Sequence, residues 1–165
     1  MNRLLFSRTY LVGPMDFCRE DGKVWRDELT EFLEEIGIIV LNPYKKPLHI
    51  THGRAMLEDD LHAQERDSLY KNEDYDGITK NMKPIRAVDL RMVDHADFLI
   101  AYLNFSVIMT GTIEEIITAN REKKPIIVLS STPKNKIPPW YFAMMPHSLF
   151  FQSLDEIKQY IKHID

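Results

Sequence analysis

Residues 97–129 read DFLIAYLNFSVIMTGTIEEIITANREKKPIIVL, and this stretch decides the fold. Its two ends are continuous apolar runs, DFLIAYL at 97–103 and PIIVL at 125–129, which have the length of buried strands. Between them, a segment with helical spacing follows Gly111-Thr112 and extends through about Arg121. Two strands joined by a helix predict a parallel β-α-β unit. Strands without polar alternation are typical of a sheet that helices cover on both faces.

The same alternation of strands and helices extends over the rest of the chain. The expected strands are 4–12, 38–41 and 149–151, and the expected helices are 24–36, one opened by Pro84 that runs through Ala96, and one capped by Ser153 and Glu156. Gly37 is the predicted stop of the first helix. We therefore predict an α/β fold. It is a single doubly wound domain over residues 1–165, with about five parallel strands flanked by helices, flavodoxin-like or Rossmann-like.

The stretch 47–80 departs from this regular pattern. It is highly charged, and its apolar anchors are sparse. We expect a partly helical excursion followed by a loop around 72–77. A lid and a solvated helix fit the charge pattern equally well.

Length, composition and charge narrow the class of protein. The chain has 165 residues, of which 44% are hydrophobic and 28% charged, as in an ordinary globular domain. The net charge of −4 argues against binding to nucleic-acid polymers, which requires a basic surface, but leaves free nucleosides and nucleotides open. A single cysteine, Cys18, fits a reducing compartment. No membrane-spanning run or signal-peptide core is evident, so we expect a cytoplasmic protein without membrane partners.

Two loops follow expected strands at the edge where doubly wound sheets bind ligands, namely 13–22 and 104–112. Gly13 allows a ligand to approach the backbone closely, and Tyr10 can offer its hydroxyl to a carboxylate or a sugar. Neither a dinucleotide fingerprint nor a P-loop follows the first strand.

Asp89 interrupts an apolar stripe. At helical spacing it lies with Ile85, Met92 and Ala96, which should face inward. A carboxylate there requires a partner or a pocket. Two interpretations stay open: an ion pair with Arg86, one turn earlier, or a general acid whose pKa burial raises.

Glu115 follows Gly111-Thr112 in the first turns of an expected helix. The helix N-terminus favours an ionised carboxylate, which could act as a nucleophile toward a sugar carbon. Alternatively, Thr112 and Glu115 form a capping box that only satisfies backbone N–H groups. The helical wheel favours the cap, because it groups Ile113, Ile116 and Ile117 on one face and turns Glu115 away. Glu114 competes for any catalytic role.

Metal and aromatic candidates are weaker. His49 and His52 are closely spaced but lack a cysteine or carboxylate in register, so we expect no metal site and no cofactor. The aromatic segment 140–142 is expected in the core or at a subunit interface.

Three motifs in order along nearly the whole chain resemble the nucleoside 2-deoxyribosyltransferase family, with its related nucleoside and nucleotide N-glycosidases. The first is YLVGP at 10–14, the second is DLRMVDHAD at 89–97, and the third is GTIEEIITA at 111–119. The resemblance implies that the chain is an enzyme that cleaves or transfers an N-glycosidic bond of a small-molecule nucleoside or nucleotide. It also implies a homo-oligomer.

The resemblance also assigns roles. Glu115 would be the nucleophile that attacks C1′ of the sugar, Asp89 the acid/base for the departing nucleobase, and Tyr10 the residue that orients the nucleophile or the sugar. The residues that would line the substrate pocket are Gly13, Pro14, Met15, Asp16, Phe17, Gly111 and Thr112.

One departure from the family pattern leaves substrate preference open. Met109 stands where the family commonly has an aspartate two residues before the glycine of the third motif. The loop GPMDFCRE resembles the nucleoside type more than the nucleotide type, although Arg19 or Arg26 could meet a phosphate. Two alternatives remain: a phosphoribohydrolase of the lysine-decarboxylase-like type, and a non-catalytic nucleotide-binding or sensor protein.

Overall fold

A five-stranded parallel sheet forms the centre of the protein. The computed structural model describes residues 3–15, 19–47, 49–51 and 59–165. The strands are β1 (Arg8–Val12), β2 (Ile39–Leu41), β3 (Phe98–Leu103), β4 (Ile126–Ser130) and β5 (Phe150–Phe151). Their spatial order is β2-β1-β3-β4-β5, and every neighbouring pair is parallel. This is the flavodoxin-like order, so the predicted α/β doubly wound fold is confirmed.

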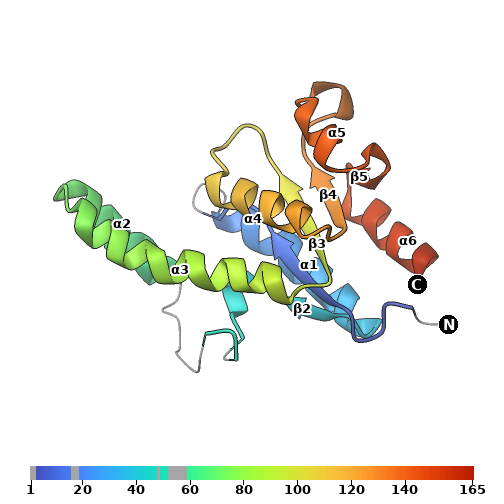
Figure 1. Cartoon of the computed structure of the whole chain (residues 1–165), viewed down its shortest axis with the longest axis horizontal. Helices are drawn as coiled ribbons and strands as arrows, with labels where there is room; N and C mark the ends of the chain where they lie inside the picture. Colours follow the sequence, from blue (N-terminus) through green and yellow to red (C-terminus); the bar gives the residue numbers. More distant parts are fainter. Residues whose placement is uncertain (1–2, 16–18, 48, 52–58) are drawn as a thin grey trace.

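Helices cover both faces of the sheet (Figure 1). On one face lie α1 (Arg19–Glu35) and α6 (Leu154–Ile164), whose apolar side chains pack on Leu11, Ile100 and Ile127. On the other face lie α3 (Tyr75–His95), α4 (Thr110–Arg121) and the short α5 (Trp140–Met144). Most residues of the central strands therefore pack in one of two cores, which explains why the strand sequences show no polar alternation.

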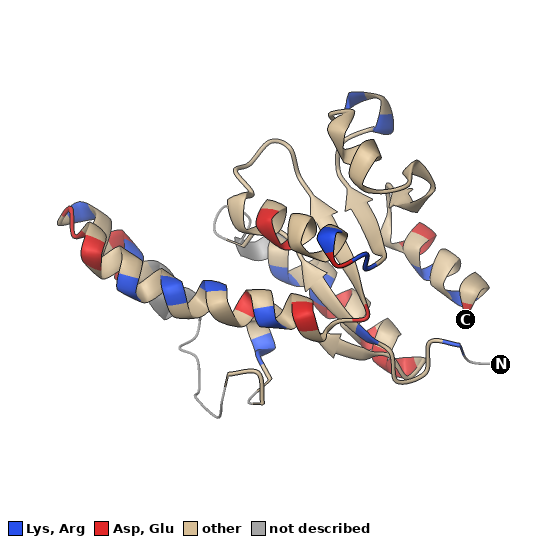
Figure 2. Ribbon diagram, in the orientation of Figure 1, with Lys and Arg blue, Asp and Glu red and all other residues tan. Residues whose placement is uncertain are grey.

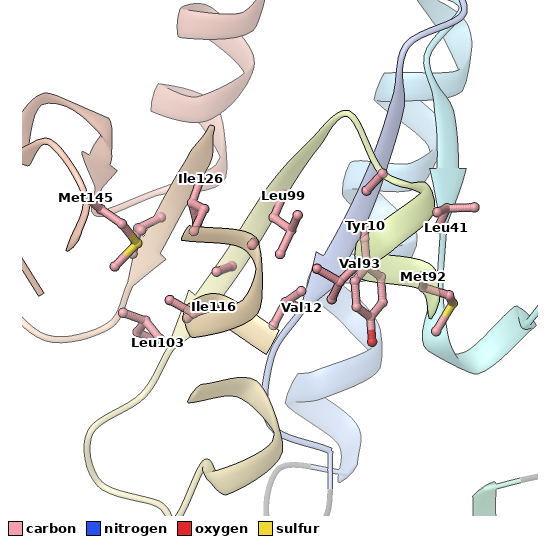
Figure 3. Close-up of a cluster of buried hydrophobic side chains, with 14 of the residues drawn as sticks. Tyr10, Val12, Leu41, Met92, Val93, Leu99, Leu103, Ile116, Ile126 and Met145 are labelled. Atoms are coloured by element: carbon pink, nitrogen blue, oxygen red, sulfur yellow. The ribbon is translucent and has the colours of Figure 1, made fainter. Parts of the chain in front are cut away.

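The core on the α3/α4 face contains Tyr10 of β1. Figure 3 draws Tyr10 in this cluster, together with Val93 and Met92 of α3 and Ile116 of α4. Only 1% of the Tyr10 surface is exposed. A buried phenol requires a hydrogen-bond partner for its hydroxyl. Tyr10 therefore needs a polar group next to this core.

Two helices joined by a short turn form a hairpin around the predicted loop at 72–77. Helix α2 (Asp59–Lys71) ends in a turn, and α3 begins at Tyr75, where the Asp74 carboxylate accepts a 2.8 Å hydrogen bond from Gly77 N. Figure 1 shows α2 and the first half of α3 extending away from the sheet, and Figure 2 shows charges of both signs along them. The predicted helical excursion is confirmed, and residues 72–74 of the predicted loop form the turn, but residues 75–77 form the first turn of α3.

Pro84 lies inside α3 and does not open it, so that prediction was wrong. A proline within a helix leaves the carbonyl four residues earlier without its N–H donor. Both Lys80 and Pro84 are exposed, so water can solvate that carbonyl. The turn before Pro84 is also held by α2, because Asn81 Nδ2 donates to Glu65 Oε2 at 2.8 Å.

Other element boundaries shift by a few residues. Strand β1 begins at Arg8 because residues 4–7 form a turn, in which Phe6 adopts a positive φ of 64° and donates its N–H to Gly37 O. Helix α1 begins at Arg19, five residues earlier than expected. The stop at Gly37 is confirmed by its φ of +81°, and the cap of α6 by a hydrogen bond from Glu156 N to Ser153 Oγ. Within the described ranges, no helix is both long enough and apolar enough to cross a bilayer.

Candidate active site

The sheet changes winding direction at β1, which lies between β2 and β3. From β1 the chain goes outward to β2 and then returns to the other side to form β3. Ligands of doubly wound sheets bind at this point, beyond the carboxyl ends of the strands. In this protein, Tyr10 of β1, Asp89 of α3 and Glu115 of α4 come together on the α3/α4 face of the sheet. They are the three predicted catalytic residues.

The Tyr10 hydroxyl donates a hydrogen bond of 2.7 Å to Glu115 Oε1. Both side chains are buried, and only 8% of the Glu115 surface is exposed. The bond joins β1 to α4 over 105 residues of sequence. It therefore fixes the orientation of the carboxyl group relative to the sheet.

Helix α4 does not carry the capping box that the sequence suggested. It begins at Thr110, one turn before Glu115, and its N-cap Met109 makes no side-chain cap hydrogen bond. The predicted inward face was wrong as well, because Ile117 is exposed and the buried face consists of Thr112, Glu115, Ile116 and Ala119. The helical wheel considers only the hydrophobicity of the side chains. The inward face is instead the one on which Glu115 contacts Tyr10 and Ile116 packs on the sheet.

Asp89 pairs with a residue that the sequence analysis missed. Lys46 Nζ lies 2.9 Å from Asp89 Oδ1, and the two side chains are 7% and 20% exposed. The ion pair with Arg86, one of the two interpretations of Asp89, does not form. Arg86 instead donates from Nε to Glu114 Oε2 at 2.8 Å, with a second contact between Arg86 Nη2 and Glu114 Oε1.

The structure separates the two neighbouring glutamates. Glu114 lies on the surface beside Arg86, which holds the pKa of the Glu114 carboxyl below its usual range. Glu115 lies inside, beside Tyr10 and Asp89. Glu114 is therefore held away from the three-residue cluster that the resemblance selected.

Burial decides the charge state of Glu115. Desolvation is the largest cause that raises its pKa, to about 8, and the negative charge of Asp89 raises it further. The Tyr10 hydrogen bond and the charges of Arg26 and Lys46 oppose this rise. The sequence indicated only the helix N-terminus, which favours the ionised form; burial of Glu115 acts in the opposite direction. Burial, followed by the charges of Glu115 and Asp89, also raises the pKa of Tyr10 well above its usual value.

The chain after β1 turns over the buried Arg26 of α1. The guanidinium donates to the backbone carbonyls of Leu11, Gly13 and Gly22 at 3.1, 2.8 and 2.6 Å. A Cβ on Gly13 would lie 3.1 Å from Arg26 Nη2 and 3.2 Å from Trp25, so the close neighbours of Gly13 are side chains of this chain. Arg26 thus supports the loop backbone, which differs from the phosphate contact suggested by the sequence.

The expected pocket residues fall into three groups. Gly13 and Pro14 are buried at the end of β1, and Met15 is half-buried. Asp16 and Phe17 lie outside the described residues. In the first turn of α4, Thr112 is buried on the face that carries Glu115, whereas Gly111 is exposed and its α-carbon faces open space.

The sequence pattern did not predict the contact of Lys46 with Asp89 or the hydrogen bonds of Arg26 to the backbone. Lys46 lies between the 3₁₀ turn η1 (Pro43–Lys45) and Pro47, in a segment without periodicity. Among the residues described, no three His, Cys, Asp or Glu side chains are grouped as metal ligands. The predicted absence of a metal or cofactor remains a prediction.

Comparison with known proteins identifies the fold. No protein-family model and no curated protein sequence matches the chain. Among solved structures, a 2-deoxyribosyltransferase from Bacillus psychrosaccharolyticus matches with a TM-score of 0.57 and 16% identity, over 92% of this chain and 90% of the other. A CMP N-glycosidase from Clostridium botulinum matches with a TM-score of 0.54 and 21% identity, over 96% and 100%.

A conserved protein from Enterococcus faecalis matches with a TM-score of 0.54 and 14% identity, over 97% of this chain and 99% of the other. At these identities the likeness shows a shared fold across nearly the whole chain. It agrees with the fold that the resemblance of the three motifs implied.

Proposed function

We propose that this protein is an enzyme that cleaves or transfers the N-glycosidic bond of a nucleoside or nucleotide, with Glu115 as nucleophile and Asp89 as acid/base. The observation that carries the proposal is the buried hydrogen bond from Tyr10 to Glu115 beside Asp89, at the winding switch of the sheet. Retaining glycosidases use two carboxyl groups, one as the nucleophile and one as the acid/base.

The reaction needs one negative charge and one proton from this pair. Glu115 in its ionised form attacks C1′ of the sugar as the bond between C1′ and the base nitrogen breaks, and the electron pair of that bond passes to the base. Asp89 in its protonated form supplies the proton that the departing base takes up. Attack of a second base on the glycosyl-enzyme completes a transfer, and attack of water completes a hydrolysis.

Tyr10 serves the nucleophile. Its hydroxyl, 2.7 Å from Glu115 Oε1, orients the carboxylate and favours its ionised form. Because the pKa of Glu115 is raised to about 8, only a minor fraction of the resting protein carries ionised Glu115 at pH 7. A proton shared by Asp89 and Glu115 can supply both required forms when it resides on Asp89.

The structural neighbours support the class of substrate. One is a 2-deoxyribosyltransferase described for nucleoside synthesis, and another is a CMP N-glycosidase. Both names concern bonds between a sugar and a base, and both proteins share this fold. The identity of the base, the presence of a 2′-hydroxyl or a 5′-phosphate, and the choice of transfer or hydrolysis are open to the assay below.

The test measures base release from deoxyribonucleosides, ribonucleosides and their 5′-monophosphates, each with and without a second free base. Wild-type protein is compared with Glu115→Ala and with the matched control Glu114→Ala, which alters the neighbouring surface carboxylate. We expect release by wild type and by Glu114→Ala, and a loss of about 10³-fold or more in Glu115→Ala. Substantial release by folded Glu115→Ala would reject the nucleophile.

A binding protein without turnover is the second candidate, favoured by Met109. This residue is buried, and its sulfur lies 3.3 Å from Asn104 N in the loop between β3 and α4. An apolar side chain thus stands where the family commonly has an aspartate. Saturable nucleoside binding without base release from any substrate of the panel would favour this candidate.

A further inference from the structure

We propose that Lys46 is a positioning residue that keeps Asp89 ionised in the resting protein, so that the one proton of the Asp89–Glu115 pair resides on Glu115. The inference rests on the proposed function for its catalytic meaning. Its physical content, the distribution of one proton over two carboxyl groups, rests on the ion pair of Lys46 with Asp89 and on the burial of Glu115 beside Tyr10.

The ion pair between Lys46 and Asp89 is shielded from water. The ammonium nitrogen lies 2.9 Å from Asp89 Oδ1, and only 7% of the Lys46 side chain is exposed. Such a pair is much less screened than a surface ion pair. The neighbouring Lys45 provides the contrast, since its side chain is 73% exposed and its ammonium nitrogen lies 3.9 Å from Asp27 Oδ1.

The backbone on both sides of Lys46 is held in place. Before it, Asn42 Oδ1 accepts a hydrogen bond of 3.0 Å from Tyr44 N and caps η1. After it, Arg91 Nη1 of α3 donates to Ile50 O at 2.8 Å. Arg91 is two residues from Asp89 on the same helix. The described residues on both sides of Lys46 therefore have hydrogen-bonded contacts, and Ile50 is bound to α3, the helix that carries Asp89.

Among the described residues, charged and titratable groups from four segments act on Glu115. Glu115 of α4 is acted on by Asp89 of α3, Tyr10 of β1, Arg26 of α1 and Lys46. Of the two cations that act on Glu115, Arg26 donates to three backbone carbonyls, whereas Lys46 forms an ion pair with Asp89. Lys46 is thus placed to stabilise the charge of Asp89 more than that of Glu115.

This distribution of charge has a consequence for the proposed reaction. An ammonium group in contact with Asp89 makes protonated Asp89 a stronger acid, which assists proton delivery to a departing base. Removal of the ammonium leaves a partly buried carboxylate next to a second carboxyl group, and such a carboxylate takes up a proton more readily. The pair then loses its preference for holding the proton on Glu115.

The test is a pH titration of the carboxyl ¹³C signals of Asp- and Glu-labelled protein, assigned with Asp89→Asn and Glu115→Gln. Lys46→Met keeps the apolar length of the side chain and removes the charge, and Lys46→Gln is a second neutral variant. Lys46→Arg restores a cation, and Lys45→Met is the matched control. We expect the Asp89 signal to show the ionised form at pH 6 in wild type. In Lys46→Met its titration midpoint should rise by about one pH unit or more.

Lys46→Arg and Lys45→Met should titrate like wild type. An Asp89 midpoint unchanged in both neutral variants would overturn the proposal. So would a wild-type titration in which Asp89 is protonated while Glu115 is ionised at pH 6.

The titration needs no substrate, so it is independent of the proposed activity. A shift in Lys46→Met together with no base release from any substrate would support the role of Lys46 and reject the enzyme. Base release by wild type with no shift in the neutral variants would support the enzyme and reject the role of Lys46.

Discussion

Tyr10 and Glu115 form the contact on which the chemistry of the site depends. The phenol lies in an apolar core, and its hydroxyl is donated to a carboxyl group that is itself buried. Burial stabilises the neutral form of Glu115, and the hydrogen bond partly offsets this effect. The charge state of one side chain thus depends on residues of β1, α1 and α3 and on Lys46.

Removal of the Tyr10 hydroxyl should raise the pKa of Glu115 further. In Tyr10→Phe the hydrogen bond that lowers this pKa is lost, while desolvation and the charge of Asp89 remain. We expect base release to fall about 10-fold or more at pH 7, and the rising limb of its pH profile to move to higher pH. Tyr160→Phe, which alters a ring packed on Phe151, is the control. Superimposable pH profiles of Tyr10→Phe and wild type would contradict the prediction.

Glu115 should also make the stability of the fold depend on pH. Its pKa in the folded protein, about 8, is above the ordinary value of 4.5, so the folded state binds more protons than the unfolded state between these values. The contribution of Glu115 is fully present below pH 4.5 and is lost as pH rises through about 8. In Glu115→Gln the side chain stays neutral, so this loss disappears.

Urea unfolding at pH 5.5 and pH 8.5 measures the difference. At each pH, the unfolding free energy of wild type is subtracted from that of Glu115→Gln. This difference should be larger at pH 8.5 than at pH 5.5 by roughly 1–3 kcal/mol. Glu114→Gln is the control, because Arg86 lowers the pKa of that surface carboxyl. Equal differences from wild type at both pH values would show that Glu115 does not titrate as described.

Among the elements, β1 and the turn that follows it depend most on their neighbours. The guanidinium of Arg26 on α1 satisfies carbonyls at three points of the chain from Leu11 to Gly22, and a Cβ on Gly13 would lie only 3.1 Å from that guanidinium. Helix α4 shows the same dependence. Its inward face is the one that carries Glu115 to Tyr10, although an isoleucine-rich face is also available.

Two glycines at helix ends should respond oppositely to alanine. Gly37, after α1, has a φ of +81°, and a Cβ there would lie 2.5 Å from Leu5 Cδ1. Gly37→Ala should therefore lower the unfolding free energy by about 1–2 kcal/mol. Gly111 lies in the first turn of α4 with no heavy atom within 4 Å of its added Cβ, so Gly111→Ala should be neutral or stabilising by up to about 1 kcal/mol. Urea unfolding of both variants tests the pair, and equal effects would contradict it.

At the scale of the whole molecule, the sheet with its two helical layers is one unit, and the α2–α3 hairpin extends beyond it (Figure 1). The segment 140–142 is only partly packed on the core of the α3/α4 face. Tyr141 packs on Phe105 and Phe142 on Phe150, with ring centroids 5.1 and 5.0 Å apart, whereas Trp140 is 76% exposed. Trp140 is therefore not a core residue, and its predicted place at a subunit interface remains a prediction.

Association of identical chains is the prediction that belongs to this scale. We expect a mass in solution that is a multiple of the 19.4 kDa chain. Sedimentation equilibrium at micromolar concentrations measures it, and Trp140→Ser should shift the equilibrium toward the single chain if the segment 140–145 lies at the interface. A mass of one chain at all concentrations would reject a homo-oligomer.

The order of strands and helices could be predicted because it depends on local patterns. Continuous apolar runs such as 98–103 and 126–130 are typical of strands in a parallel sheet covered on both faces. Gly37 ends a helix because it adopts a positive φ, and Ser153 begins one because its hydroxyl caps the helix. The boundaries around Pro84 could not be predicted, because packing of α2 on α3 and solvent at Lys80 tolerate the proline inside the helix.

The sequence by itself determined the doubly wound α/β fold and selected Tyr10, Asp89 and Glu115 as a set, through motifs that resemble one family. Only the tertiary structure decided which partner each of them has. Glu115 accepts a hydrogen bond from Tyr10 and does not cap its helix, Asp89 pairs with Lys46 and not with Arg86, and Glu114 is held at the surface. The physical reason is that secondary structure follows from neighbours in sequence, whereas burial and charge pairing join residues that are 28 to 105 positions apart.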